Sequence, residues 1–89
     1  MLKINLSKRS EKFLKNLPPK QAKQIVHKLM ALRLNSDSHD TSKLKNSDYL
    51  RTDVGEYRII HYVNLETLNV VLIGKRNDDE IYRQLKRLS

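Results

Sequence analysis

The chain has 89 residues, enough for one domain over residues 1–89 and too few for two domains with separate cores. Its 18 Lys and Arg residues against 10 Asp and Glu residues give a formal net charge of +8 at pH 7, which predicts an anionic partner such as nucleic acid or an acidic protein. No membrane partner is expected, because the longest apolar run is Val70–Ile73 and a membrane-spanning helix needs about 18 apolar residues or more. The N-terminal residues lack an apolar signal region, which favours the cytoplasm.

The N-terminal half of the sequence predicts one strand and two helices. Residues 2–6 alternate between apolar and polar, the pattern of a strand with one buried face. Ser7 is a suitable N-cap for a short amphipathic helix that ends at Pro18, and Pro19 suits the first position of a second helix. In that second helix the apolar residues follow helical spacing, at Ala22, Ile25, Val26, Leu29 and Leu32. Residues 35–42 are polar and turn-prone, and they are predicted to form a surface loop.

The C-terminal half predicts three strands joined by tight turns. Residues 49–54 and 57–63 alternate in polarity, and residues 69–73 form a mixed apolar run. Gly55–Glu56 is suited to the first turn and residues 65–67 to the second, so the three strands are expected to form an antiparallel meander.

A last helix is predicted after the meander. Asn77 is its expected N-cap, three acidic residues fill its first turn, and its core side is formed by Ile81, Leu85 and Leu88. The predicted fold is therefore α+β, with a four-stranded antiparallel sheet packed by an N-terminal helical hairpin, a C-terminal helix, and the element order βααβββα.

Arg58 is the first residue whose position suggests chemistry. It lies near the start of a predicted strand and shares a face with Ile60 and Tyr62. A guanidinium group offers a planar fork of donors that stays charged, so it is suited to holding a phosphate. The alternative is a solvated strand arginine with no ligand.

The segment between the last strand and the last helix forms a second candidate site. Lys75 and Arg76 lie where a helix N-terminus offers free N–H donors to an anion. The alternative is that the acidic residues 78–80 occupy the helix dipole themselves. Tyr82 lies next to the core position Ile81, so it is either a tyrosine at the edge of the core or a side chain that reaches the groove over the sheet.

Metal and cofactor sites are not expected. His27, His39 and His61 are far apart in the sequence and there is no cysteine, so a zinc site is not predicted. No glycine-rich phosphate loop is present either, and no small-molecule cofactor is expected.

An ordered set of motifs over most of the chain resembles the RelE branch of the RelE/ParE toxin superfamily. It consists of the segments Leu44-Lys45, Tyr49-Leu50-Arg51, Val54-Gly55-Glu56-Tyr57-Arg58-Ile59-Ile60, Val71-Leu72-Ile73-Gly74-Lys75-Arg76 and Glu80-Ile81-Tyr82. The order of the predicted elements is also similar to that of this family.

The resemblance implies a ribosome-dependent endoribonuclease, an mRNA interferase that cuts messenger RNA in the decoding site and is blocked by a cognate antitoxin. Arg58, Arg76 and Tyr82 match positions that serve catalysis in RelE-like enzymes. In metal-free RNA cleavage the arginines would stabilise the phosphorane charge, and Tyr82 would stack on a base or take part in proton transfer. The nearby lysines, Lys43, Lys45 and Lys75, are expected to bind RNA.

The sequence departs from the family pattern in the strand before Gly55. RelE-like enzymes often carry two basic residues there, two positions apart, whereas this chain has Arg51 and no basic partner at Tyr49 or Asp53. Arg51 counts among the expected catalytic cations, but an arginine is a poor general base because it does not release its proton. Lys45 or Lys75 with a lowered pKa could take that role.

Two other functions remain open at this point. One is the ParE-like class, which inhibits gyrase without cutting nucleic acid, although Tyr82 after Gly-Lys-Arg argues against it. The other is a non-catalytic member that binds its antitoxin or nucleic acid through charge alone, with a steep dependence on salt.

Overall fold

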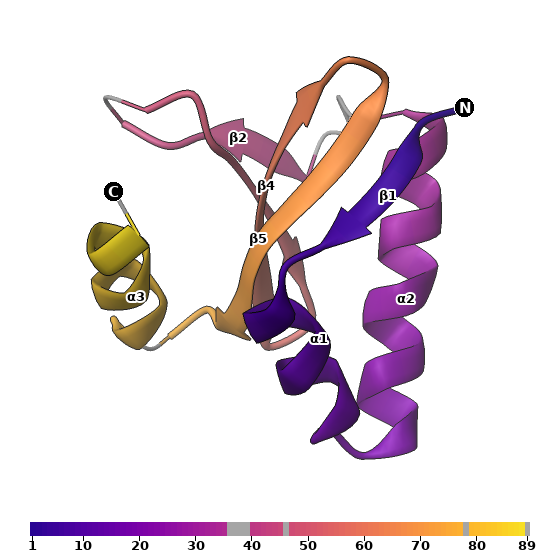
Figure 1. The fold of residues 1–89 in the computed structure, drawn as a ribbon. Helices are drawn as coiled ribbons and strands as arrows, with labels where there is room; N and C mark the ends of the chain where they lie inside the picture. Colours follow the sequence, from indigo (N-terminus) through magenta and orange to yellow (C-terminus); the bar gives the residue numbers. More distant parts are fainter. Residues whose placement is uncertain (36–39, 46, 78, 89) are drawn as a thin grey trace.

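The computed structural model describes residues 1–35, 40–45, 47–77 and 79–88, with Leu88 described by its backbone alone. Within these residues there are three helices and five strands (Figure 1). In chain order they are β1 (Lys3–Leu6), α1 (Lys8–Lys15), α2 (Pro19–Leu34), β2 (Thr41–Lys43), β3 (Leu50–Val54), β4 (Tyr57–Asn64), β5 (Thr67–Lys75) and α3 (Glu80–Leu88). The α+β class, the helical hairpin and the helix that begins at Pro19 are confirmed.

The strands form one mixed sheet in the order β1-β5-β4-β3-β2. The predicted antiparallel meander of β3, β4 and β5 is confirmed. The prediction of a purely antiparallel sheet is wrong, because β1 pairs with β5 in parallel, with Lys3 beside Thr67 and Leu6 beside Val70. Polarity alternates with a period of two in both kinds of strand, so the sequence pattern carries no information on direction.

The prediction of four strands is also wrong, since part of the predicted surface loop is the edge strand β2. This strand pairs antiparallel with β3, and the element order is therefore βααββββα. Two side-chain hydrogen bonds cross from β2 to β3: Thr41 and Thr52 share one of 2.6 Å between their hydroxyls, and Arg51 Nε donates to Ser42 Oγ at 2.9 Å. Such polar cross-strand pairs stabilise a strand that has no apolar alternation. Residues 36–39 of the predicted loop, which include His39, lie outside the described residues.

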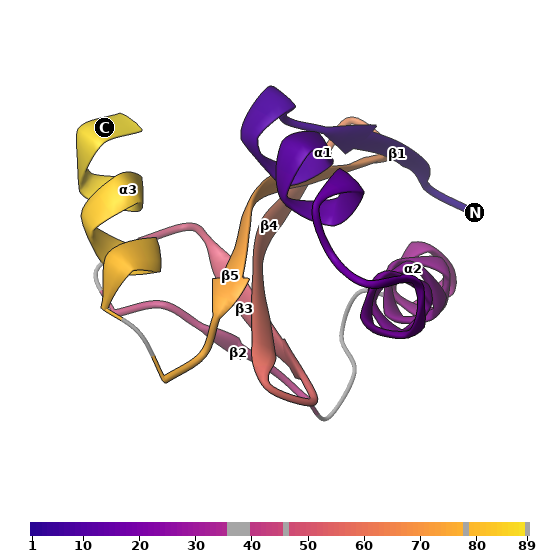
Figure 2. The ribbon, with the colours of Figure 1, turned by 90° about the horizontal axis from the view of Figure 1, so that it is seen from below.

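The helices cover opposite faces of the sheet. Seen from below, α1 and α2 lie on one side of the strands and α3 lies on the other (Figure 2). The larger cluster, on the side of the helical hairpin, consists of the buried residues Ile25, Leu29, Leu32, Val54, Tyr57, Ile59, Leu68, Val70 and Ile73. The smaller cluster, on the side of α3, is built on Ile60, Leu72 and Ile81. Both faces of β4 are thus buried, and α3 packs on the smaller of the two clusters.

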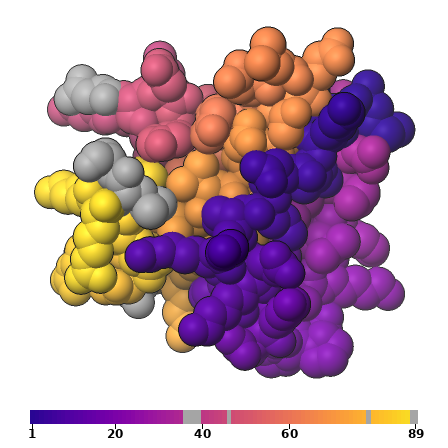
Figure 3. Space-filling view, in the orientation of Figure 1, coloured from indigo at the N-terminus to yellow at the C-terminus, as the bar shows by residue number. Residues whose placement is uncertain are grey.

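Helix α1 is joined directly to β5 at its N-terminus. Ser7 is its N-cap, as predicted, and accepts a hydrogen bond from the Ser10 backbone N–H at 3.1 Å. The Ser7 hydroxyl donates to the Val71 carbonyl oxygen at 2.6 Å, and its backbone N–H donates to Val70 at 2.9 Å. In the space-filling view α1 lies in front of β5, between α3 and α2 (Figure 3).

Helix α3 begins later than predicted, so Asn77 is not its N-cap. The sheet extends further than the apolar run, because β5 continues to Lys75 and the Arg76 backbone N–H donates to the Glu56 carbonyl oxygen at 3.0 Å. The helix starts at Glu80, and the backbone N–H groups of Tyr82 and Arg83 donate to the Asp79 carbonyl oxygen. Ile81 is buried as predicted, whereas the side chain of Leu88 lies outside the described residues.

Gly74 lets α3 approach β5. An added Cβ at this position would lie 3.3 Å from Ile81 Cδ1 and 3.4 Å from Ile81 Cβ. The shorter contact is tighter than ordinary van der Waals packing, so a Cβ at this position would require Ile81 to shift by a few tenths of an ångström. The glycine therefore helps to fix Tyr82, which follows Ile81, relative to the sheet.

The turn between β4 and β5 contains backbone strain that a substitution can relieve. Leu65 and Glu66 have φ angles of 49° and 63°, in the left-handed region that ordinary side chains disfavour. Leu65 is 89% exposed, so its side chain contributes little to the core.

We expect Leu65→Asn to stabilise the protein by about 1 kcal/mol, because asparagine tolerates this conformation in two-residue turns. The free energy of unfolding in urea measures the effect, and Leu65→Ala is the matched control since it removes the same exposed side chain without that tolerance. Equal stability of the two variants would show that backbone strain is not the cause.

A chain of buried polar groups links β2, β3 and β4. The Thr41 hydroxyl contacts that of Thr52, and the Thr52 hydroxyl lies 2.7 Å from His61 Nε2. Thr52 and His61 are fully buried, and His61 Nδ1 has no hydrogen-bond partner among the described residues. Burial lowers the pKa of His61 to about 4. The imidazole is therefore neutral at pH 7.

Candidate active site

Arg58 and Asp53 form the centre of the site through a cross-strand pair. They lie opposite each other on β4 and β3, because a two-residue turn at Gly55 joins Val54 to Tyr57. Arg58 Nε donates to Asp53 Oδ1 at 2.7 Å and Arg58 Nη2 donates to Asp53 Oδ2 at 3.2 Å, so the ion pair is bidentate. The Arg58 side chain is only 12% exposed. This geometry holds the guanidinium plane in one orientation.

Tyr82, on helix α3, contacts the same guanidinium group. Arg58 Nη1 donates to the Tyr82 hydroxyl, and the Arg58 Cζ atom lies 5.8 Å from the centre of the Tyr82 ring. The tyrosine is half-buried and packs in the smaller cluster, on the side of α3. Tyr82 thus lies at the edge of the smaller core cluster, and its hydroxyl accepts a hydrogen bond from Arg58.

The charges at this centre stabilise each other. The pKa of Asp53 is lowered, first by its hydrogen bonds from Arg58 and also by the positive charges of Arg58, Arg76 and Arg51. The pKa of Arg58 is raised, mainly by the hydrogen bonds to Asp53. Asp53 is thus ionised and Arg58 is positively charged at neutral pH.

Arg51 and Arg76 flank the pair. Arg51 lies opposite Ile60 in the β3–β4 register, on the face that carries Arg58, and it is half-buried against Ser42. Arg76 follows β5 and is exposed, and its backbone N–H bond to Glu56 holds it beside the β3–β4 turn. Both arginines act on the Asp53 carboxyl, so the three predicted arginines belong to one electrostatic cluster.

The three predicted lysines lie in three different places. Lys45 lines a hollow that Tyr82 also lines. Lys43 is exposed at the end of β2 and pairs with Leu50. Because Leu50 is adjacent to Arg51 on β3, Lys43 lies on the face of the sheet opposite to that of Arg51. Lys75 pairs with Tyr57, on the side of the helical hairpin, and lines a groove between α1 and α3.

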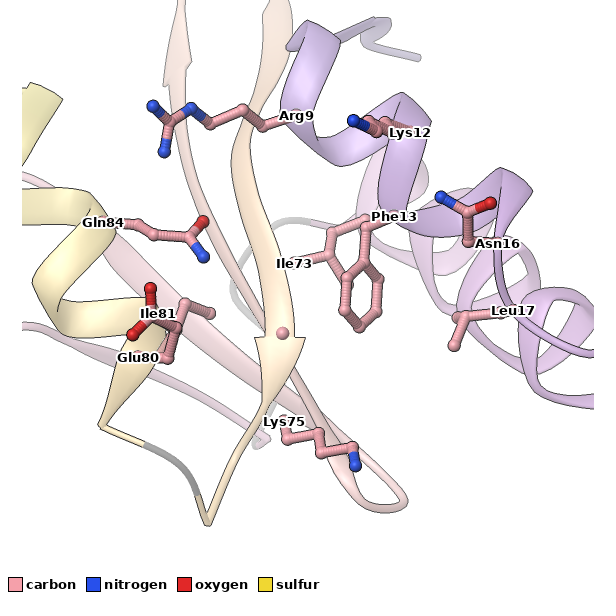
Figure 4. Close-up of a pocket in the computed structure, with 11 residues that line it drawn as sticks. Arg9, Lys12, Phe13, Asn16, Leu17, Ile73, Lys75, Glu80, Ile81 and Gln84 are labelled. Atoms are coloured by element: carbon pink, nitrogen blue, oxygen red, sulfur yellow. The ribbon is translucent and has the colours of Figure 1, made fainter.

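That groove has an apolar floor and a basic rim (Figure 4). Its volume is about 550 Å³, and it lies across β5 with Arg9 of α1 and Gln84 of α3 extending into it from opposite sides. The floor is formed by Phe13, Leu17, Ile73 and Ile81, and three cations, Arg9, Lys12 and Lys75, outnumber the one acidic residue of the lining, Glu80. Its composition suits an acidic segment with an apolar face.

Asp53 is the member of the site that sequence reasoning missed. The sequence pattern marks this position only by its lack of a basic residue, yet the Asp53 carboxylate accepts the hydrogen bonds of both Arg58 Nε and Arg58 Nη2. The signal was available, because a two-residue turn at Gly55–Glu56 places Asp53 opposite Arg58 in an antiparallel hairpin.

Among the described residues, no three side chains of the metal-binding types gather closely enough to hold a metal ion. Over the same part of the chain, no helix is long and apolar enough to cross a membrane.

The sequence matches no family model and no curated protein. The structure is similar to that of a double mutant of the Escherichia coli toxin RelE in the free state, with a TM-score of 0.80, 20% identity, and 99% of this chain and 98% of that chain covered. A chain of the RelB–RelE antitoxin–toxin complex from Methanococcus jannaschii has a TM-score of 0.67 and 29% identity, over 94% of this chain and 98% of that chain. A chain of the Mycobacterium tuberculosis RelBE2 toxin–antitoxin complex has a TM-score of 0.75 and 15% identity, over 84% of this chain and 98% of that chain.

These likenesses agree with the ordered sequence motifs that end in Gly74-Lys75-Arg76 and Glu80-Ile81-Tyr82. They extend over most of this chain and nearly all of each solved chain. The chain therefore has the fold of the RelE toxins, and its ordered motifs are similar to those of the RelE branch of the RelE/ParE superfamily.

Proposed function

We propose that this chain is the toxin of a type II toxin–antitoxin system and acts as a ribosome-dependent endoribonuclease that cuts messenger RNA in the ribosomal A site. The observation that carries the proposal is Arg58, fixed between Asp53 and Tyr82 on a face flanked by two further arginines. The likeness to the E. coli toxin RelE supports it. The net charge of +8 suits an RNA substrate.

The proposed reaction is an attack of the ribose 2'-hydroxyl on the adjacent phosphorus. The new O2'–P bond forms as the P–O5' bond breaks, which leaves a 2',3'-cyclic phosphate and a 5'-hydroxyl. The 2'-hydroxyl proton passes to a base, and the leaving 5'-oxygen gains a proton from the site or from water. Arg58 and Arg76, with Arg51 beside them, stabilise the charge that develops on the phosphorane oxygens.

Asp53 and Tyr82 have different parts in this proposal. Asp53 is a positioning residue, since it occupies Nε and Nη2 of Arg58 and directs the remaining guanidinium donors. Tyr82 contacts the base next to the cleaved phosphate with its ring. Of the two lysines, only Lys45 lies near this site, because Lys45 shares a hollow with Tyr82 while Lys75 lines the groove between α1 and α3.

The proposed partners are the ribosome with its messenger and a cognate antitoxin, all in the cytoplasm. Exposed cations such as Lys43 on β2 and Lys20 and Lys23 on α2 would contact ribosomal RNA. The groove of Figure 4, with its apolar floor and basic rim, would receive an acidic amphipathic segment of the antitoxin. Several similar solved chains come from toxin–antitoxin complexes, which supports this partner.

Arg76→Ala is expected to abolish growth arrest on induced expression, because it removes an exposed cation that the proposal assigns to the phosphate. The variant should remain folded, since a surface cation contributes little to stability. Arg83→Ala is the matched control: Arg83 is exposed on α3 and pairs with Glu80 at 3.6 Å, outside the arginine cluster. Retained arrest in the Arg76 variant, or loss in both variants, would contradict the assignment of Arg76.

A further inference from the structure

A second hollow lies beside the arginine cluster, between the turn that joins β2 to β3 and helix α3. Its volume is about 520 Å³, within the range of roughly 300–1,000 Å³ typical of small-ligand pockets. The turn and α3 lie on the same side of the sheet (Figure 1). The residues that line the hollow are Leu44, Lys45, Ser47, Tyr49, Tyr82, Leu85 and Lys86.

The walls of this hollow are mostly aromatic and apolar. Leu44, Tyr49, Tyr82 and Leu85 all pack against the smaller buried cluster, so the walls are backed by the core. Ser47 and two lysines, Lys45 and Lys86, complete the lining. An apolar hollow with cations on its lining suits a flat, uncharged group carried on an anionic backbone.

Tyr49 is held in place as one wall. Its ring lies 5.7 Å from the ring of Tyr62, at an interplanar angle of 54°. Its backbone N–H donates to Ser47 Oγ at 2.9 Å, and its carbonyl oxygen accepts from the Leu44 N–H at 2.9 Å. These contacts fix the strand end that carries the ring, so little conformational entropy is lost when a ligand stacks on it.

Tyr82 links the hollow to the proposed phosphate site. The hydroxyl of this residue accepts a hydrogen bond from Arg58, while the residue also lines the hollow. A phosphate held by Arg58 therefore leaves the attached nucleotide next to an aromatic and apolar recess. Lys45 adds a positive charge on the same side, complementary to the RNA backbone.

From this geometry we infer that the hollow binds an RNA base next to the phosphate at Arg58, with Tyr49 as a stacking residue opposite or beside Tyr82. The inference rests on the proposed function, and it adds a base-binding residue at a position where RelE-like enzymes often carry a basic one. Aromatic rings stack on any base, so Tyr49 contributes affinity and fixes the nucleotide.

The test uses the purified full chain and a short single-stranded RNA that carries 2'-O-methyl groups, so that no cleavage can occur. Binding is compared with that of an abasic ribose–phosphate chain of the same length and charge. We expect the abasic chain to bind the wild type about tenfold more weakly, since one stacked base contributes about 1–3 kcal/mol. Equal binding of the two oligonucleotides would overturn the inference, and would favour an apolar protein side chain as the occupant.

Variants of Tyr49 test whether the difference in binding between the base-containing and abasic RNA arises in this hollow. Tyr49→Leu should bind the base-containing RNA about tenfold more weakly and the abasic chain as the wild type does, while Tyr49→Phe keeps the ring and should bind both normally. An equal loss for both oligonucleotides in the leucine variant would overturn the role of Tyr49. Circular dichroism of each variant checks the fold, and the abasic comparison on the wild type stands even where a variant is unstable.

The outcome is independent of whether the chain cuts messenger RNA. Base-dependent binding without cleavage on ribosomes would support the pocket and contradict the proposed function. Cleavage on ribosomes with equal binding of both oligonucleotides would contradict the pocket alone.

Discussion

Arg58→Lys is expected to reduce the rate of messenger cleavage on ribosomes by a factor of about 100 to 1,000, the usual effect of removing one preorganised donor from a transition state. Lysine keeps the charge but loses the planar fork that Asp53 orients through Nε and Nη2. The hydrogen bond to the Tyr82 hydroxyl would be lost or rearranged as well. Single-turnover cleavage of a messenger bound to programmed ribosomes measures the effect.

Two comparisons separate catalysis from structure in that experiment. Tyr82→Phe removes the hydroxyl contact with Arg58 and keeps the ring, so we expect a smaller loss than for Arg58→Lys. Arg9→Lys changes an exposed arginine on the rim of the α1–α3 groove and should leave the rate unchanged. If Arg58→Lys cleaves at the wild-type rate, the Arg58 guanidinium is not needed for catalysis, and its role is the structural ion pair with Asp53 between β4 and β3.

The second large effect concerns stability in acid. The pKa of His61 is lowered by burial from 6.5 to about 4, so the unfolded chain binds a proton at a pH where the folded protein does not. The free energy of unfolding should therefore be unaffected by this group above about pH 7 and should fall as the pH drops from 6.5 toward 4. The total loss is about 3 kcal/mol, because one pKa unit corresponds to about 1.4 kcal/mol.

Urea unfolding between pH 7 and pH 4 measures this dependence, and two variants isolate it. His61→Gln lacks the titrating group and should show a shallower decline, from a lower starting stability because the contact with Thr52 is disturbed. His27→Gln changes an exposed histidine on α2 and should retain the wild-type decline. Parallel pH profiles for His61→Gln and the wild type would contradict the account.

Most of the architecture could be predicted from local patterns. The helical hairpin follows from the cap at Ser7 and from Pro18–Pro19, and the β3–β5 meander follows from alternation broken by turn residues. Two features could not be predicted in this way. The parallel pairing of β1 with β5 has the same alternation as an antiparallel one, and β2 forms through polar side-chain contacts with β3 rather than through an apolar face.

The candidate site was predicted in part for a similar reason. Separate sequence patterns indicate Arg58 and Tyr82, and the structure brings them into contact although they lie on β4 and α3. Lys75 is adjacent to Arg76 in the sequence, but strand alternation turns adjacent residues to opposite faces, and Lys75 lines the α1–α3 groove. A phosphate site is indicated in the sequence by cations, whereas Asp53 contributes a carboxylate that orients one of them, so a search for cations does not find it.

The proposed cleavage of messenger RNA on the ribosome can be observed directly. The purified chain is added to a cell-free translation reaction, and the 5' ends of a defined messenger are mapped with and without ribosomes engaged on it. New 5' ends within codons are expected only when ribosomes are engaged. A messenger that stays intact under both conditions would contradict it, and gyrase inhibition would be the next activity to measure.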